Sequence, residues 1–356
     1  MHDGTEPSLE PRETTRRRLS GTGLTVRGVA RRELRPIWLL AGVALSLLAG
    51  YLAVRDVDFG LFVDALAASE YRWLLPAMAA LVAAFALRAI RWWSLFPPET
   101  RPPFGPIVRS MFIGEFFNSI LPLRPGELVR ILALHRETGA SRAQAFGTTV
   151  TERLYDVGCL LLFFVVSLPF VSAPSWLPRA LALLAVTCLA AGGTAMVVGR
   201  YGPRPIAFAL RPLARLDGIT EARTELAAYN VLQGLGGLQR LGLAATTFGL
   251  TTLSWVAVAA CFWFTLRASG LELGFEAAIL AVVATTFSLV LPALPTSVGV
   301  FEAAVIVALQ PFDVSASQAL SYAVVVHVLT FAPFIAAGAV ALRGHAVQSA
   351  RWRGSH

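Results

Sequence analysis

The chain alternates between long apolar runs with few charges and shorter polar segments rich in arginine. About 20 apolar residues in an α-helix suffice to cross a hydrocarbon core about 30 Å thick. The pattern therefore predicts an all-α, polytopic membrane helical bundle with six full spans. We expect these spans at about residues 36–54, 73–96, 144–171, 176–198, 241–266 and 318–342.

Two further apolar segments, residues 107–134 and 275–309, are interrupted by proline and glycine. The pieces on either side of each interruption are too short to cross the bilayer, and proline breaks a helix. We therefore predict two re-entrant helical hairpins. The expected helix breaks are Pro122, Gly126, Pro292 and Gly299.

The two interrupted segments also resemble each other. FNSILP, starting at Phe117, parallels FSLVLP, starting at Phe287, and a Gly and then a Glu follow in both. The same register places Arg153 opposite His327. In the predicted topology the hairpins enter from opposite sides, and inverted repeats of this kind surround the binding site of many transporters. A chance recurrence of Leu-Pro in apolar sequence is the alternative. The two inverted halves are residues 36–199 and 241–342.

Arginine placement predicts the orientation in the membrane. All 30 cationic residues are arginine, only 15% of residues are charged, and the net charge is +8. Arginine-rich segments face the cytoplasm, so we expect a multi-pass cell-membrane protein with both termini inside. The predicted domains are a disordered cytosolic tail (1–35), a membrane domain (36–342) that includes a cytosolic loop (200–240), and a basic cytosolic tail (343–356).

Composition and motifs exclude several functional classes. The arginines are not interleaved with exposed aromatic residues, so nucleic acid is not an expected partner. Cys159, Cys188 and Cys261 lie in apolar runs without metal-ligand spacing, so we expect neither a metal site nor a disulfide framework. Nucleotide-binding, metalloprotease and hydrolase motifs do not occur, so no enzyme activity and no cofactor are expected.

Ionisable side chains inside predicted membrane helices are costly, and they usually face a cavity or a charged partner. Glu127 and Arg130 share a helix face, as do Glu152 and Asp156. We expect Arg153 to pair with the adjacent Glu152. Purely structural charge pairing is the alternative to a binding role. The predicted substrate-binding residues are Asn118, Arg124, Glu127, Arg130, Glu152, Arg153, Asp156, Glu302 and His327.

A phosphate is the chemical group that these residues suit best. A helix that begins after Pro125 and Gly126 would present free N–H groups and a positive dipole end to an anion. Arg124, Arg130 and Arg153 would add bidentate contacts. We therefore predict a polar pocket inside a membrane protein that tolerates a phosphate.

Aromatic and basic residues mark the end of the second span. Arg88, Arg91, Trp92 and Trp93 are interpreted as an interfacial anchor, because tryptophan and arginine concentrate at the membrane surface. Trp255 is interpreted as a belt or packing residue in the same way. These residues are left outside the predicted site.

Three strings carry a family resemblance: FFNSILPLRPGELVRILAL, TVTERLYDVGCLLL and LPALPTSVGVFEAAVIVAL. They resemble the flippase-like membrane family related to the transmembrane region of lysylphosphatidylglycerol synthetase, over about residues 36–342. The chain departs from the family pattern at Ser297-Val298, where a second glycine is common, and at His327, where arginine is common. The carried-over positions are Asn118, Pro122, Arg124, Gly126, Glu127, Arg130, Glu152, Arg153, Asp156, Pro292, Gly299 and Glu302.

The resemblance implies lipid translocation or a link to lipid-linked sugar pathways. We therefore expect a flippase-like transporter that moves a phospholipid or a lipid-linked headgroup through a central polar cavity. A non-catalytic accessory or membrane enzyme component of an envelope pathway is the alternative. The expected partners are membrane lipids and, in the alternative, envelope-biosynthesis enzymes. Aminoacyl transfer is not expected, because the chain ends at His356 without the soluble synthetase domain.

Overall fold

The computed structural model describes residues 58–67, 69–121, 124–170, 201–210, 221–289 and 297–353, together with isolated positions between 48 and 55 and between 186 and 193. Within these ranges, all the regular secondary structure is helical. Two predicted spans (36–54 and 176–198), the tail 1–35 and the breaks at Pro122 and Pro292 lie largely or wholly outside the described residues.

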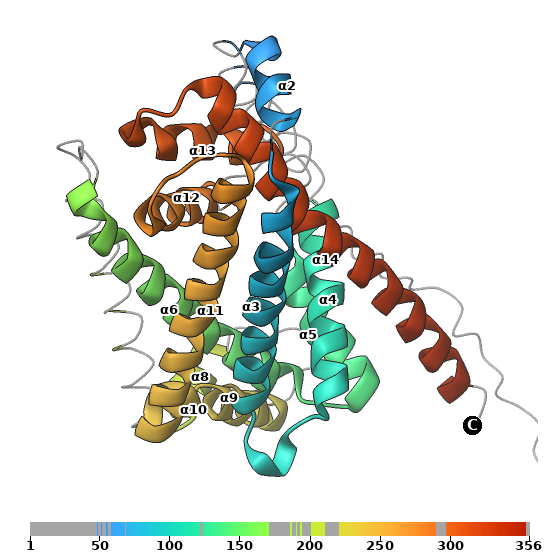
Figure 1. Ribbon diagram of the computed structural model, residues 1–356. Coiled ribbons are helices and arrows are strands. Elements are labelled where there is room, and N and C mark those ends of the chain that lie inside the picture. The colour runs from blue at the N-terminus through green and yellow to red at the C-terminus, as the bar shows by residue number, and fades with distance from the viewer. Residues whose placement is uncertain are drawn as a thin grey trace, which may run out of the picture.

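Among the described residues, three helices have the length and composition of membrane spans: residues 71–94, 241–268 and 316–344. They contain α3 (Leu74–Ser94), α11 (Leu241–Ala268) and most of α14 (Ala316–Arg353). Helices α3 and α11 lie side by side, and α14 crosses the molecule beside them (Figure 1). The last predicted span, 318–342, lies within the third of these helices, and α14 itself continues to Arg353.

A fourth long helix, α6 (Arg142–Ser167), has 26 residues but carries charges in its middle. It begins at Ser141, whose side chain accepts a hydrogen bond from the backbone N–H of Gln144. Such an N-cap satisfies a donor that the first turn leaves without a helical partner. The predicted helix at residues 144–171 is therefore present, and its charged residues define the site described below.

Both interrupted segments form pairs of short helices. The first pair is α4 (Phe104–Ile120) and α5 (Gly126–Thr138), and the second is α12 (Phe275–Ser288) and α13 (Val300–Leu309). At 1.5 Å per residue, even the 17 residues of α4 reach only about 26 Å. The helix interruptions are thus confirmed, whereas the re-entrant placement and the inverted repeat remain predictions.

Two segments that lie between the predicted spans contain helices. α2 (Phe59–Ala67) lies in the 55–72 segment, and α8 (Arg204–Leu210), α9 (Glu221–Gly234) and α10 (Gly236–Gln239) lie in the 200–240 segment. The 200–240 segment, predicted as a cytosolic loop between spans, contains helix because α9 is rich in strong helix formers. Helix α9 packs so closely on α6 that a Cβ added to Gly147 or Gly234 would meet backbone atoms of the other helix.

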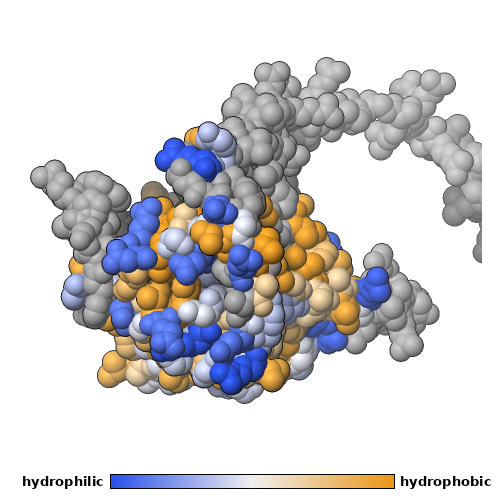
Figure 2. Space-filling view, turned by 45° about the horizontal axis from the view of Figure 1, so that its top comes forward, coloured by the Kyte–Doolittle hydropathy of each residue, from blue (hydrophilic) through white to orange (hydrophobic). Residues whose placement is uncertain are grey.

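Two apolar clusters hold these elements together. One joins α6, α11, α12, α13 and α14 and includes the fully buried Ala281 and Tyr322. The other fixes α4 and α5 against α3 and α6 through Trp92, Phe96 and Leu134. The outer surface is also largely apolar: hydrophobic residues cover much of the face in view in Figure 2, between clusters of hydrophilic ones. An apolar exterior is what a bilayer requires.

Candidate functional site

Six charged side chains from three helices form a closed ring of alternating sign between α3, α5 and α6. We call it the charge ring. In order around the ring its members are Arg91, Glu152, Arg130, Glu127, Arg153 and Asp156.

The inner side of the charge ring is built on Arg91 of α3. Its guanidinium lies 3.2 Å from Glu152 and 2.7 Å from Asp156, and it also donates to the hydroxyl of Thr251 on α11 at 2.8 Å. Glu152 in turn accepts from Arg130 of α5 at 2.6 Å. Arg91 and Glu152 are each only 1% exposed, so this side of the ring is sealed inside the protein.

The outer side of the charge ring runs through Glu127 and Arg153. Arg130 approaches Glu127 at 2.9 Å, Glu127 accepts from Arg153 at 2.7 Å, and Arg153 lies 3.6 Å from Asp156. The side chain of Arg153 is 53% exposed and that of Glu127 is 31% exposed. The ring therefore has one closed side and one open side, and a ligand can reach only the open one.

Two features of this geometry differ from the sequence-based expectations. Arg91 is a buried ring member and not an interfacial anchor, because α3 continues past it and turns it toward α6. Arg153 bonds to Glu127 and not to the adjacent Glu152, since consecutive residues on a helix do not face each other. An arginine within a predicted span is itself a signal of a polar site, and this signal at Arg91 was missed.

Tryptophan side chains support the ring. The Nε1–H of Trp255 donates to Asp156 at 3.2 Å, and Trp92 lies under Arg130, with 4.4 Å between the guanidinium carbon and the ring centroid. Trp92 also donates to Thr148 at 3.0 Å. Both indoles therefore belong to the buried polar network, and a belt position is excluded for them.

Two further arginines stand at the open side without an ion pair among the described residues: Arg88 and Arg124. Arg88 lies over Trp255 at 4.8 Å, and its Nε is buried with no hydrogen-bond partner. Arg124 occupies the turn between α4 and α5 with a left-handed φ of 47°. Both have Glu115 and Arg153 among their charged neighbours. The ring is neutral, so these two arginines and Glu115 leave the site with one excess positive charge.

The backbone N–H at the start of α5 is hydrogen-bonded within the protein. The N–H of Gly126 donates to Asn118 Oδ1 of α4 at 2.7 Å. A Cβ on Gly126 would collide with the carbonyl of Gly114 and with Asn118. The Gly126 N–H, expected to bind a phosphate, is therefore used to close the hairpin, and Asn118 positions α5 instead of facing a ligand through that oxygen.

The remaining two predicted residues form a separate pair. His327 Nδ1 of α14 lies 2.6 Å from Glu302 Oε1 of α13, and Glu302 Oε2 accepts from the N–H of Gly299 at 2.6 Å. Among the described residues, no hydrogen bond or ion pair links this pair to the charge ring. The pair borders its own cavity of about 320 Å³, whose other walls are apolar.

The ring carboxylates are engaged with arginine, and the part of the chain that the structure describes holds no group of three or more His, Cys, Asp or Glu side chains able to ligate a metal.

Comparison with known proteins assigns the chain to a family. A family model described as the lysylphosphatidylglycerol synthase TM region matches residues 39–338. The chain belongs to this family. A "UPF0104 membrane protein" of Methanothermobacter thermautotrophicus is 24% identical over 278 residues, which cover 75% of this chain and 82% of that protein.

Membership of the lysylphosphatidylglycerol synthase TM region family confirms the resemblance drawn from the sequence motifs, and it agrees with a membrane location. The matched residues include both helix pairs and all members of the charge ring. Membership of a transmembrane family, together with the three span-like helices, shows that this is a membrane protein.

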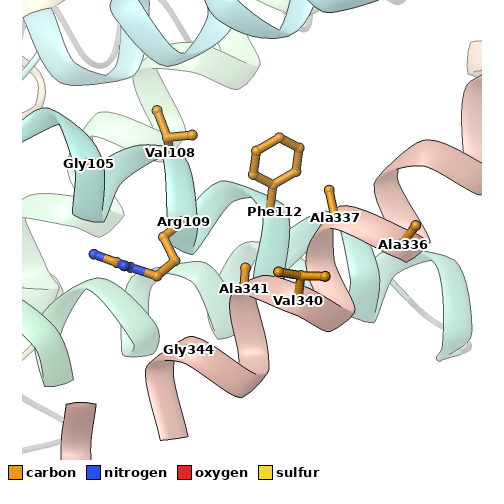
Figure 3. Close-up of a pocket in the computed structure, with 9 residues that line it drawn as sticks. All are labelled: Gly105, Val108, Arg109, Phe112, Ala336, Ala337, Val340, Ala341 and Gly344. Carbon is orange, nitrogen blue, oxygen red and sulfur yellow. The ribbon is translucent and has the colours of Figure 1, made fainter. Parts of the chain in front are cut away.

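One groove among the described residues of this family member lies away from the ring. It has a volume of about 770 Å³ and runs between α4 and α14. Figure 3 shows Val108 and Phe112 of α4 facing Ala337 and Val340 of α14 across it, with Arg109 at the edge. Arg109 is bonded to Glu137. The groove is apolar, so it offers contacts to hydrocarbon but little that would recognise a polar headgroup.

Proposed function

We propose that this protein moves lipids with a phosphate-bearing headgroup between the leaflets of the membrane, without chemical conversion. The supporting observation is the pair of arginines without ion-pair partners, Arg88 and Arg124, beside the exposed side chain of Arg153. In our proposal the phosphate binds among these three guanidinium groups.

Charge balance favours an anionic ligand at this position. A cation held away from water without a partner is costly, whereas the ring arginines are already neutralised by carboxylates. Arginine binds phosphate through two parallel hydrogen bonds, which an ammonium group cannot form. A phosphodiester carries one negative charge, which equals the excess charge of the site.

The open side of the charge ring also offers a way to release the ligand. Glu127 and a phosphate would compete for Arg153, because both are anions that accept from the same guanidinium. Replacing one anion by the other at Arg153 costs little electrostatic energy, so the headgroup can bind and also dissociate. The sealed side, with Arg91 and Glu152, would keep the helices in place while the open side changes partners.

A leaflet-exchange assay in proteoliposomes tests the proposal. The purified protein is reconstituted with fluorescent phosphatidylglycerol, and exchange is compared for Arg88→Gln, Arg124→Gln and the control Arg72→Gln. Arg72 is a suitable control because it is exposed and paired with Glu70. Loss of a hydrogen bond to a charged group costs about 1.5–3 kcal/mol, so lipid binding should weaken by about 10- to 150-fold in the first two variants, and exchange should slow accordingly.

The results of this assay distinguish lipid transport from the accessory role. Wild-type exchange in Arg88→Gln and Arg124→Gln, or equal exchange of a fluorescent diacylglycerol without phosphate, would contradict the proposed headgroup site. Binding of phosphatidylglycerol without any exchange would favour the accessory role in a lipid-linked pathway. Thermal unfolding of each variant in detergent controls for a folding defect.

We also propose that the protein lies in the cell membrane with six spans, two inverted halves and both termini in the cytoplasm. The support is the arginine-rich composition of both tails and of residues 200–240. Single cysteines are introduced at Asp58 or at Arg204 in a variant without the native cysteines. A membrane-impermeant reagent added to intact cells should label the cysteine at position 58 but not the one at position 204. Labelling of both from outside would refute the orientation.

A further inference from the structure

We propose that the Glu302–His327 pair is a proton-binding site that couples proton binding to the movement of the second helix pair. This inference rests on the proposed lipid transport for its coupling role, but proton binding itself is independent of transport. Proton binding at this pair would drive or regulate translocation.

The hydrogen bonds fix where the proton binds. Glu302 Oε2 already accepts from Gly299, so Oε1 is the oxygen that faces His327 Nδ1. A carboxylate only accepts, so Nδ1 carries the hydrogen and the lone pair of the neutral ring is on Nε2. A proton that binds at Nε2 converts the imidazole to an imidazolium and the hydrogen bond to an ion pair. No other bond changes.

Because the pair is buried, its net charge affects how strongly α13 is attached to α14. Glu302 is 9% exposed and His327 is 7% exposed. His327 is packed between Phe301 and Phe331, with centroid distances of 4.6 Å and 4.5 Å. With neutral histidine the pair has one net negative charge among apolar walls, and with imidazolium it is neutral. Protonation should therefore strengthen the attachment of α13 to α14, and proton loss should weaken it.

The first half of the molecule provides an internal comparison. Glu127, in the first turn of α5, bonds to Arg153 on the next helix, just as Glu302, in the first turn of α13, bonds to His327 on the next helix. Arginine is always charged, whereas histidine changes charge within the physiological range. The ion pair of the first helix pair thus does not depend on histidine protonation, whereas that of the second helix pair does.

His327 is the charged side chain with the largest influence on Glu302. Helix α12 has one ionisable residue, Glu276, and α13 has only Glu302. None of the groups on the helices packed against α13 and α14 bonds to the pair. These groups are Asp64, Arg109, Glu115, Glu127, Arg130, His135, Arg136, Glu137, Cys261, Arg267, Tyr322 and Arg343.

Proton binding is measured directly on the wild-type protein in nanodiscs, with ¹³C- and ¹⁵N-labelled histidine. The five histidine ring signals are followed from about pH 5 to about pH 8. The His327 signal is identified by its loss in His327→Gln or, should that variant not fold, by its shift in Glu302→Gln. We expect an Nδ1–H tautomer at high pH and protonation at Nε2 as the pH falls. A ring that stays in one state throughout overturns the proposal.

Coupling is measured by exchange of fluorescent phosphatidylglycerol at about pH 5.5 and about pH 8. The wild-type rate should differ several-fold between the two, and the ratio should fall to about 1 in His327→Arg, which has the permanent charge seen at Arg153. The matched control is His135→Gln, because both nitrogens of His135 contact groups outside the pocket; it should retain the wild-type ratio.

The two proposals fail in different ways. If the wild type exchanges no lipid at either pH, the proposed function fails, and the titration alone decides whether the proton site exists. If exchange occurs with the same rate at both pH values, or if His327→Arg retains the wild-type ratio, the coupling role is wrong even though the transport proposal stands.

Discussion

Replacement of Arg91 by methionine is the most direct test of the charge ring. Methionine fills much of the same space but removes the guanidinium that bridges Glu152 and Asp156. Glu152 retains Arg130 at 2.6 Å. Asp156 keeps the Trp255 N–H and a distant Arg153 at 3.6 Å, so a buried carboxylate loses its main partner.

The expected effect is large because the removed group is almost fully buried. Removal of one partner of a buried ion pair costs about 3–5 kcal/mol, against a total stability of about 5–15 kcal/mol for a typical protein. At about 2–4 °C per kcal/mol, the range for chains of about 150–250 residues, the unfolding midpoint should fall by at most about 6–20 °C in this longer chain. Unfolding is measured by the fluorescence of the detergent-solubilised protein during heating.

Two comparisons make the result specific. Arg72→Met should change the midpoint little, because the Arg72–Glu70 pair is on the surface and such pairs contribute about 0–1 kcal/mol. Adding Asp156→Asn to Arg91→Met should restore part of the loss, since the uncompensated charge disappears. A midpoint for Arg91→Met within the range of Arg72→Met, or a double variant less stable than Arg91→Met, would refute the buried ring.

Three further predictions follow from the same contacts. Gly126→Ala should lower stability by about 1–3 kcal/mol in the same thermal assay, through overpacking against α4. The control Gly158→Ala, whose added Cβ meets no atom within 4 Å, should be neutral or stabilising. Equal effects of the two substitutions would contradict the close contact between α4 and α5. Trp255→Phe should cost about 1–3 kcal/mol, because Asp156 loses a buried donor, and an unchanged midpoint would argue against that bond. Glu127→Gln should raise the affinity for phosphatidylglycerol in native mass spectrometry, since it frees Arg153 from its anionic competitor; weaker binding would count against the headgroup site.

The sequence was informative wherever a local rule applied. Long apolar runs predicted α3, α11 and α14, and proline with glycine predicted that residues 107–134 and 275–309 are interrupted. The cost of charges inside apolar segments also selected five of the six ring residues. These inferences depend on the chain near each position, so a single sequence is sufficient for them.

Local rules failed where a partner lies on another helix. The sequence paired Arg153 with its neighbour Glu152, but a rotation of about 100° per residue separates adjacent side chains on a helix, and the structure gives each a different partner. Arg91 was assigned to the membrane surface because its position at the end of an apolar run is ambiguous. Only the packing of α3 against α6 shows that it is buried.

The sequence by itself thus determined the helical membrane architecture, the helix interruptions and the residue types of the site. The tertiary structure decided which charges neutralise one another, which arginines are left over, and that Glu302 and His327 form a pair of their own. The reason is physical. Burial and helix propensity act on one residue and its neighbours, whereas an ion pair requires two side chains to meet, and that depends on how separate helices pack.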